Sequence, residues 1–148
     1  MNEEEQSIDD IEKSYQSALH LYTITYSILK EPKLFLGIIY NIFQSVEKAL
    51  QRLTQSPQDS NINSLLHKLQ QLYSEDKKVI SSCESLRQLS ETITLHKKST
   101  ILFPRGQSLV LADKKYELKL ITSADIGSFL AVNYFLITLI KREMNRKE

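Results

Sequence analysis

The sequence predicts a mostly α-helical protein: a four-helix bundle with a β-hairpin inserted between the third and fourth helices. Glycine and proline are rare, with three of each among 148 residues, so few positions interrupt long helices. Apolar side chains recur every three or four residues over most of the chain, which is the period of a helix. One stretch, at about 107–121, instead alternates apolar and polar positions with the period of a strand.

The first helix is predicted to begin near Ser7, because a serine hydroxyl and the carboxylates after it suit the positive end of a helix. Pro32 ends this helix and also suits the first turn of the next one. Because only two or three residues separate the two helices, we expect an antiparallel helical hairpin. The apolar positions are Ile11, Tyr15, Ala18, Tyr22, Tyr26 and Leu29 in the first helix, and Phe35, Ile38, Ile39, Ile42, Phe43, Val46, Ala49, Leu50 and Leu53 in the second.

A polar loop at 55–61 precedes the third helix, which we expect to run from Ile62 to about Leu95. Segment 74–77 could cap a new helix, but one long helix is favoured. The hairpin then places Leu109 and Leu111 on one strand and Tyr116, Leu118 and Leu120 on the other, around a turn at 112–115 that lacks glycine. Just before it, Pro104-Arg105-Gly106 predicts a further turn.

The last helix is predicted to start at a capping box formed by Thr122 and Asp125. Its segment 129–140 is apolar on nearly all sides, so the helix should be buried centrally or face a partner chain. This apolar run is far shorter than the ~20 residues that a membrane span needs.

Composition fits one soluble globular domain, 1–148, with 41% hydrophobic and 25% charged residues. The net charge, 19 − 18 = +1, creates no global field toward nucleic acid or anionic membranes. Cys83 is the only cysteine, so no intrachain disulfide can form and a reducing compartment is expected. The acidic N-terminus has no apolar core for a signal peptide. We therefore expect a cytoplasmic protein with no membrane partner.

No pattern typical of a metal site, a cofactor site or a nucleophile stands out. His20, His67 and His96 fall on different predicted segments and have no ligand partner at metal-binding spacing. Three glycines cannot form a nucleotide-binding fingerprint. Cys83 lies on an apolar seam, where a buried thiol is a better interpretation than a nucleophile. We expect neither a metal nor a cofactor.

Basic residues gather between 97 and 119, where six cations face two carboxylates, an excess of 6 − 2 = +4. At the end of the third helix, cations complement the negative end of the helix dipole, which alone could explain two of them. The alternative is a basic face that binds phosphate or an acidic partner. The candidate binding residues are Lys97, Lys98, Arg105, Lys114, Lys115 and Lys119.

Several short segments resemble a group of small, uncharacterised archaeal helical proteins, a resemblance that implies no activity. They are Ala18-Leu19-His20-Leu21 with Thr25-Tyr26, Lys30-Glu31-Pro32-Lys33-Leu34 and Leu95-His96-Lys97-Lys98-Ser99. More distantly, the helical pattern is similar to HEPN-type bundles, several of which are RNases with an arginine closely followed by a histidine. Here the nearest pair is Arg87 and His96, and the eight residues between them depart from that spacing.

These observations favour a non-catalytic interaction module that self-associates. The apolar last helix and the absence of an acid–base or nucleophile constellation support this hypothesis. Its partner would be a second copy or another protein. The first alternative is an RNA- or DNA-binding protein that uses the basic hairpin region. The second is a HEPN-like RNase in which Arg87 and His96 act on the phosphodiester.

Overall fold

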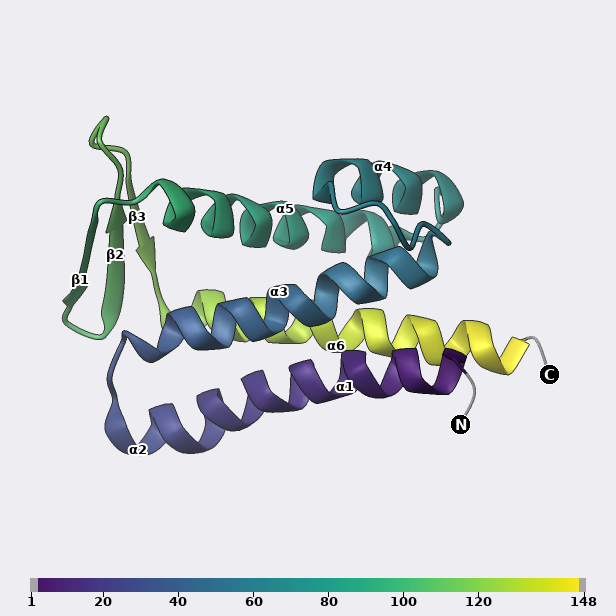
Figure 1. Cartoon of the computed structure of the whole chain (residues 1–148), viewed down its shortest axis with the longest axis horizontal. Coiled ribbons are helices and arrows are strands. Elements are labelled where there is room, and N and C mark those ends of the chain that lie inside the picture. Colours follow the sequence, from purple (N-terminus) through teal and green to yellow (C-terminus); the bar gives the residue numbers. More distant parts are fainter. Residues whose placement is uncertain (1–2, 147–148) are drawn as a thin grey trace.

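The protein is mostly helical, with a three-stranded antiparallel sheet before its last helix, as the computed structural model shows for residues 3–146. Side chains are described for residues 7–146. Four long helical segments, which we call rods, lie side by side, and the sheet lies at one end of them (Figure 1). Near the other end, a short helix packs along the helix that follows it in the sequence. The broad fold prediction is confirmed, while the number of helices and of strands differs from it.

The first rod contains α1 (Glu3–His20), a π-helical segment η1 (Leu21–Tyr26) and α2 (Ser27–Leu29). It starts four residues before the predicted position, because further acidic residues precede Ser7 and also favour the positive helix end. Lys30 ends the rod in a left-handed conformation, with a φ of 54°. The rod then pairs with α3 (Leu34–Leu53), which confirms the predicted helical hairpin.

The predicted single helix from Ile62 to Leu95 is wrong. The structure has α4 (Ile62–Leu72) and α5 (Lys77–Lys98). Asp76 is the N-cap residue of α5. Its Oδ1 accepts hydrogen bonds from the backbone N–H groups of Lys78 (3.0 Å) and Val79 (3.2 Å), and this cap starts a new helix.

The loop between α3 and α4 is held by one carboxylate. Asp59 Oδ2 accepts hydrogen bonds from Ser64 Oγ (2.7 Å) and Lys68 Nζ (3.0 Å), and its Oδ1 accepts from the Asn61 N–H (2.9 Å). The Ser64 hydrogen bond, followed by those of Asn61 and Lys68, lowers the pKa of Asp59 from 3.8 to about 2.

Asp59→Asn is expected to lower the melting temperature near neutral pH and to matter less in acid. Because the folded-state pKa lies below the ordinary value, the carboxylate stabilises the fold above about pH 4 and loses this effect as the pH falls through about 2. Thermal unfolding of both proteins, followed by circular dichroism between neutral pH and pH 2, measures the difference. A gap in melting temperature that stays constant over this range would contradict the role of Asp59.

The sheet contains one strand more than predicted. Strands β2 (Ser108–Ala112) and β3 (Leu118–Ile121) confirm the hairpin at 107–121, and β1 (Ile101–Arg105) pairs with the other side of β2. The predicted turn at 104–106 is partly wrong, because residues 104 and 105 belong to β1 and only Gly106, with a φ of 61°, lies in the turn.

The turn between β2 and β3 needs no glycine, because a side chain caps it. Asp113 Oδ1 accepts hydrogen bonds from the backbone N–H groups of Lys115 and Glu117, both at 2.9 Å. Tyr116 takes a positive φ of 62° inside this turn, so β3 starts at Leu118 and not, as the alternation suggested, at Tyr116.

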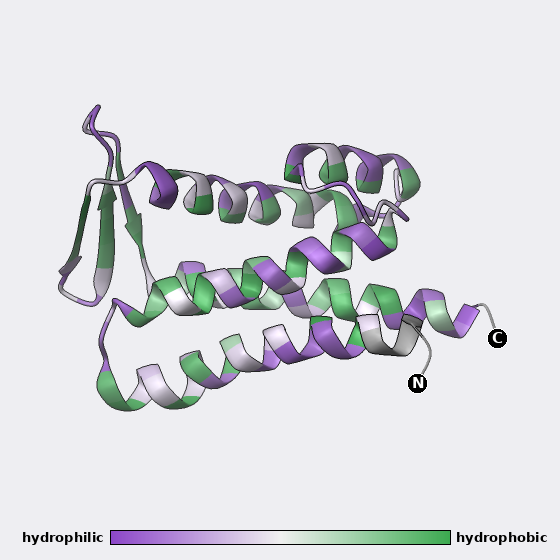
Figure 2. Ribbon diagram, in the orientation of Figure 1, coloured by the Kyte–Doolittle hydropathy of each residue, from purple (hydrophilic) through white to green (hydrophobic). Residues whose placement is uncertain are grey.

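The last helix, α6 (Ser123–Arg146), starts as predicted. The Thr122 N–H donates to Asp125 Oδ2 (2.9 Å), and the Asp125 N–H donates to Thr122 Oγ1 (3.2 Å). The helix packs against α1, α3 and α5 and buries nine side chains. The apolar residues of the helices gather on the sides that face one another (Figure 2). The all-round apolar character of α6 is thus largely explained by its central place.

By length and composition α6 could also cross a membrane, which the apolar run at 129–140 did not suggest. It has 24 residues, and half of its most apolar window is buried inside the bundle. A core helix of a soluble protein passes the same test, so this property decides nothing about location.

A polar link joins three helices in the core. Ser45 of α3 donates from Oγ to the Ile11 carbonyl of α1 (2.8 Å) and accepts a hydrogen bond from Asn133 Nδ2 of α6 (2.8 Å). Both side chains are fully buried. Asn133 Oδ1 has no hydrogen-bond partner within the described part of the chain.

Candidate interaction surface

The two faces of the sheet differ in how they meet the helices. In antiparallel strands, residues directly opposite each other point to the same side and neighbours along a strand point to opposite sides. Leu109 and Leu111 of β2, with Ile121 opposite Leu109, are 0–1% exposed and belong to the core. Leu102 of β1, opposite Leu111, is on the same side but is 38% exposed. The inner face therefore anchors the sheet to the helices through β2 and the end of β3.

The opposite side, which we call the outer sheet face, combines exposed apolar side chains on the two edge strands with two nearly buried ones on β2, Val110 (5% exposed) and Ala112 (3%). Val110 lies at its centre, paired with Phe103 on one side and Leu120 on the other. Ala112 is likewise flanked by Ile101 and Leu118. The four flanking side chains are exposed by 47% (Ile101), 42% (Phe103), 70% (Leu118) and 49% (Leu120). Contiguous exposure of several large apolar side chains marks interaction sites.

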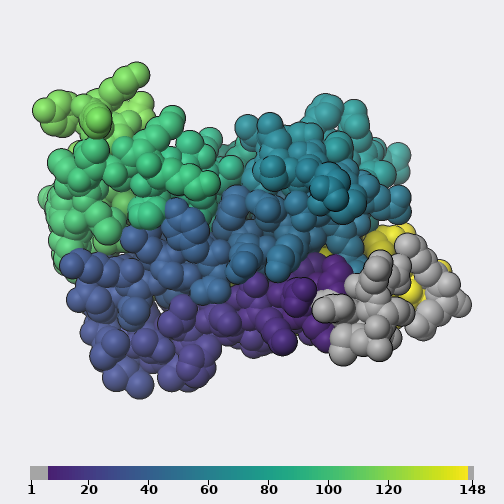
Figure 3. All heavy atoms as spheres, viewed as in Figure 1, coloured from purple at the N-terminus to yellow at the C-terminus, as the bar shows by residue number. Residues whose placement is uncertain are grey.

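Basic residues flank this face at both ends of the sheet. Arg105 ends β1 and faces the outer side by its register with Ser108, while Lys114 and Lys115 lie in the turn between β2 and β3. That second turn projects beyond the neighbouring surface (Figure 3) and carries Tyr116, which is 85% exposed. We call Arg105, Lys114 and Lys115 the basic rim.

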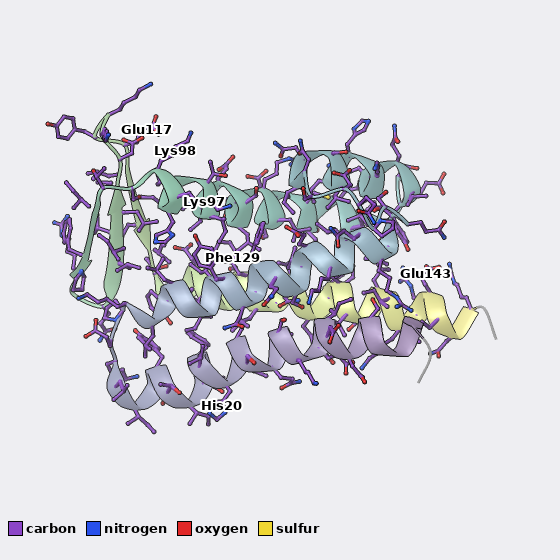
Figure 4. All side chains as sticks on the ribbon, in the orientation of Figure 1. His20, Lys97, Lys98, Glu117, Phe129 and Glu143 are labelled. Carbon is purple, nitrogen blue, oxygen red and sulfur yellow. The ribbon has the colours of Figure 1, made fainter. Side chains whose placement is uncertain are left out.

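The six predicted binding residues do not share one face. Lys97 and Lys98 lie in the last turn of α5, at the end nearest the sheet, where they complement the helix dipole (Figure 4). Lys119 points to the inner side, because its partner Leu111 does. Only Lys98 and Lys119 meet in a groove. The other candidates are the three residues of the basic rim.

This groove, of about 730 Å³, lies between α5 and the β2–β3 hairpin. Lys98 and Lys119 line it together with Arg87, and Glu91 and Glu117 line it as well. Its charged residues therefore sum to 3 − 2 = +1. Such a mixed lining gives little electrostatic attraction for a phosphate backbone.

The two candidate catalytic residues face different sides of α5. Nine positions correspond to about two and a half helical turns, which puts side chains on opposite faces and about 14 Å apart along the axis. His96 Nδ1 is hydrogen-bonded to the Tyr40 hydroxyl of α3 (2.7 Å), with the two rings edge to face. Arg87 lines the groove and pairs with Glu84 (3.5 Å). The structure does not bring them together.

His96→Ala is expected to lower the free energy of unfolding by about 0.5–1.5 kcal/mol through loss of the bond to Tyr40. We expect no change in RNA cleavage. Denaturant unfolding and an RNA cleavage assay measure the two effects, with Lys97→Ala as an exposed control on the same helical turn. If the wild type cleaves RNA and His96→Ala does not, the RNase hypothesis is supported instead.

Cys83 is fully buried, as predicted. Burial raises the pKa of its thiol and so disfavours the reactive thiolate. Among the described side chains, those of residues 7–146, no three of histidine, cysteine, aspartate or glutamate lie together where they could hold a metal ion.

Comparison with family models, curated proteins and solved structures gives no match.

Sequence reasoning missed the outer sheet face. Ile101-Leu102-Phe103 is an unbroken apolar run that ends at a proline and shows no alternation, so no buried or exposed side could be assigned. The available signal was the length of the run, which is that of a short strand beside the predicted hairpin. All five residues of β1 are exposed because the strand lies at the edge of the sheet, a position that only the structure reveals.

Proposed function

We propose that this protein is a non-catalytic interaction module whose contact surface is the outer sheet face. The observation that carries the proposal is the exposure of Ile101, Phe103, Leu118 and Leu120 on one side of a sheet whose other side is buried in the core along β2 and at the end of β3. A face of this kind, rimmed by polar residues, is typical of a docking site.

The residues best suited to chemistry support a non-catalytic role. His96 is engaged by Tyr40, Arg87 lies on another side of the helix, and the Cys83 thiol is buried with a raised pKa. General acid–base or nucleophilic catalysis needs such groups within hydrogen-bond reach of one another.

Self-association was predicted from the apolar last helix. Because nine side chains of α6, including most of its large apolar ones, are buried in the bundle, the outer sheet face is a better candidate for contact with a second copy. Size-exclusion chromatography with light scattering tests this for the wild type and for the double variant Phe103→Ser/Leu118→Ser. Self-association that the variant loses supports the proposed surface, and self-association that it keeps contradicts it.

Nucleic-acid binding is the second hypothesis, supported by the meeting of Arg87, Lys98 and Lys119 in the groove. Glu91 and Glu117 line the same groove and reduce its positive charge, so this hypothesis has less support than contact through the outer sheet face. If the wild type is retained on an RNA column at low salt and Lys98→Glu/Lys119→Glu abolishes this retention, nucleic-acid binding becomes the better-supported function.

A further inference from the structure

A second apolar group lies at the same end of the molecule as the sheet. We call it the α2 cluster: Ile24, Ile28 and Leu29, exposed by 49%, 75% and 63%. The first rod reaches the sheet end because the Tyr22 hydroxyl hydrogen-bonds the carbonyl of Ser123, two residues after β3 (3.2 Å). Figure 1 shows both at the same end of the molecule, with the sheet above and α2 below it in the view.

Cations accompany both apolar groups. The basic rim flanks the outer sheet face, and Lys30 and Lys33 directly follow the α2 cluster. None of the ion pairs found among the described side chains involves these five residues.

The acidic neighbours of these cations are Glu31, Asp113 and Glu117, which leaves an excess of 5 − 3 = +2. Two of the three carboxylates already accept hydrogen bonds from the backbone, Asp113 from two N–H groups and Glu31 from the N–H of Lys33 (3.3 Å).

We infer that the sheet end docks on an anionic lipid bilayer, with the outer sheet face and the α2 cluster in the interfacial region and the cations against lipid headgroups. The inference rests on the contact surface of the proposed function and names its partner. It replaces the expectation of no membrane partner, which was based on the net charge of the whole chain and not on the local charge of the sheet end. Peripheral binding depends on buried apolar area together with attraction to anionic lipid. Each basic residue near such a surface contributes a factor of about five in affinity.

A second copy complements this end less well. In a two-fold symmetric dimer the same patch meets itself, so the basic rims of both copies would add to one positive interface. Pairing through the free edge of β1 is hindered as well, because Pro104 in that strand has no N–H for a further strand. A bilayer supplies the opposite charge and needs no matching shape.

Co-sedimentation with vesicles tests the inference. The wild type should bind phosphatidylserine-containing vesicles at least about tenfold more tightly than pure phosphatidylcholine vesicles, and added salt should reduce the difference. Phe103→Ser/Leu118→Ser and Lys114→Glu/Lys115→Glu should each weaken binding to the anionic vesicles about tenfold or more. Circular dichroism establishes that both variants remain folded.

Matched controls come from the far end of the molecule. Leu72→Ser removes an apolar side chain that is 61% exposed at the end of α4, and Lys13→Glu/Lys77→Glu changes the net charge as much as the rim variant does. Both controls should bind anionic vesicles like the wild type, except for a small uniform loss from net charge. A control as weak as its matched variant would show that the sheet end is not the site.

Three results would overturn the inference: no binding to anionic vesicles, equal binding to neutral ones, or full binding by the sheet-end variants. If the wild type instead fails to bind vesicles but self-associates, and Phe103→Ser/Leu118→Ser abolishes that self-association, the proposed function remains. Its partner is then a second copy. Absence of both would remove the proposed function too.

Discussion

Leu111→Ala is expected to lower the free energy of unfolding by about 2–5 kcal/mol, the usual cost of truncating a fully buried leucine. Leu111 lies on the inner face of β2, has no exposed surface and contributes to the core. The loss combines the lost transfer of apolar atoms from water with the cavity left behind. Urea unfolding measured by circular dichroism gives the difference from the wild type.

Leu118→Ala is the matched control, because the same change is made on the outer face of the same hairpin. Leu118 is 70% exposed, so its truncation should stay within about 0.5 kcal/mol of the wild type. Equal losses for the two variants would contradict the division of the sheet into an inner and an outer face. That division underlies the proposed contact surface.

Ser45→Ala is expected to destabilise the fold by about 1–3 kcal/mol, because it leaves the buried amide of Asn133 without a partner. The Oδ1 atom of Asn133 already has no partner among the described residues, so the variant would leave both polar atoms of this side chain without a hydrogen bond. Chemical denaturation of the purified variant measures this cost.

Adding Asn133→Leu to Ser45→Ala should restore much of the lost stability. The double variant replaces both polar partners by apolar groups, which is close to neutral when the shape is kept. A double-mutant cycle with both single variants isolates the coupling between the two side chains. Strictly additive effects would mean that the hydrogen bond between α3 and α6 contributes nothing to stability.

The helical part of the fold could be predicted because each helix carries its own apolar period. A break between α4 and α5 was an alternative for segment 74–77, but one helix was favoured because apolar positions continue at helical spacing across it. The competing signal was Asp76, whose carboxylate caps the N-terminus of a second helix. A local hydrogen bond here outweighs the periodicity on either side.

The candidate site was less predictable than the fold. Basic residues at 97–119 are close in the sequence, yet the two turns of the sheet carry them to opposite ends and Lys119 points inward with Leu111. Likewise, nothing in the composition of β1 distinguishes an edge strand with exposed apolar side chains from a buried one. The direction of Lys119 depends on strand register and the exposure of β1 on its place at the edge of the sheet, and local spacing encodes neither.

The arrangement of α6 separates the two ends of the molecule: the sheet lies at one and the chain termini at the other (Figure 1). This helix leaves the sheet at Ser123 and extends over 24 residues, about 36 Å, so that Arg146 lies at the far end together with the start of α1 (Figure 1). A fluorophore or affinity tag joined near either terminus would therefore stand away from whatever the sheet touches. On a supported bilayer, such a probe would report the upright height of the bound protein.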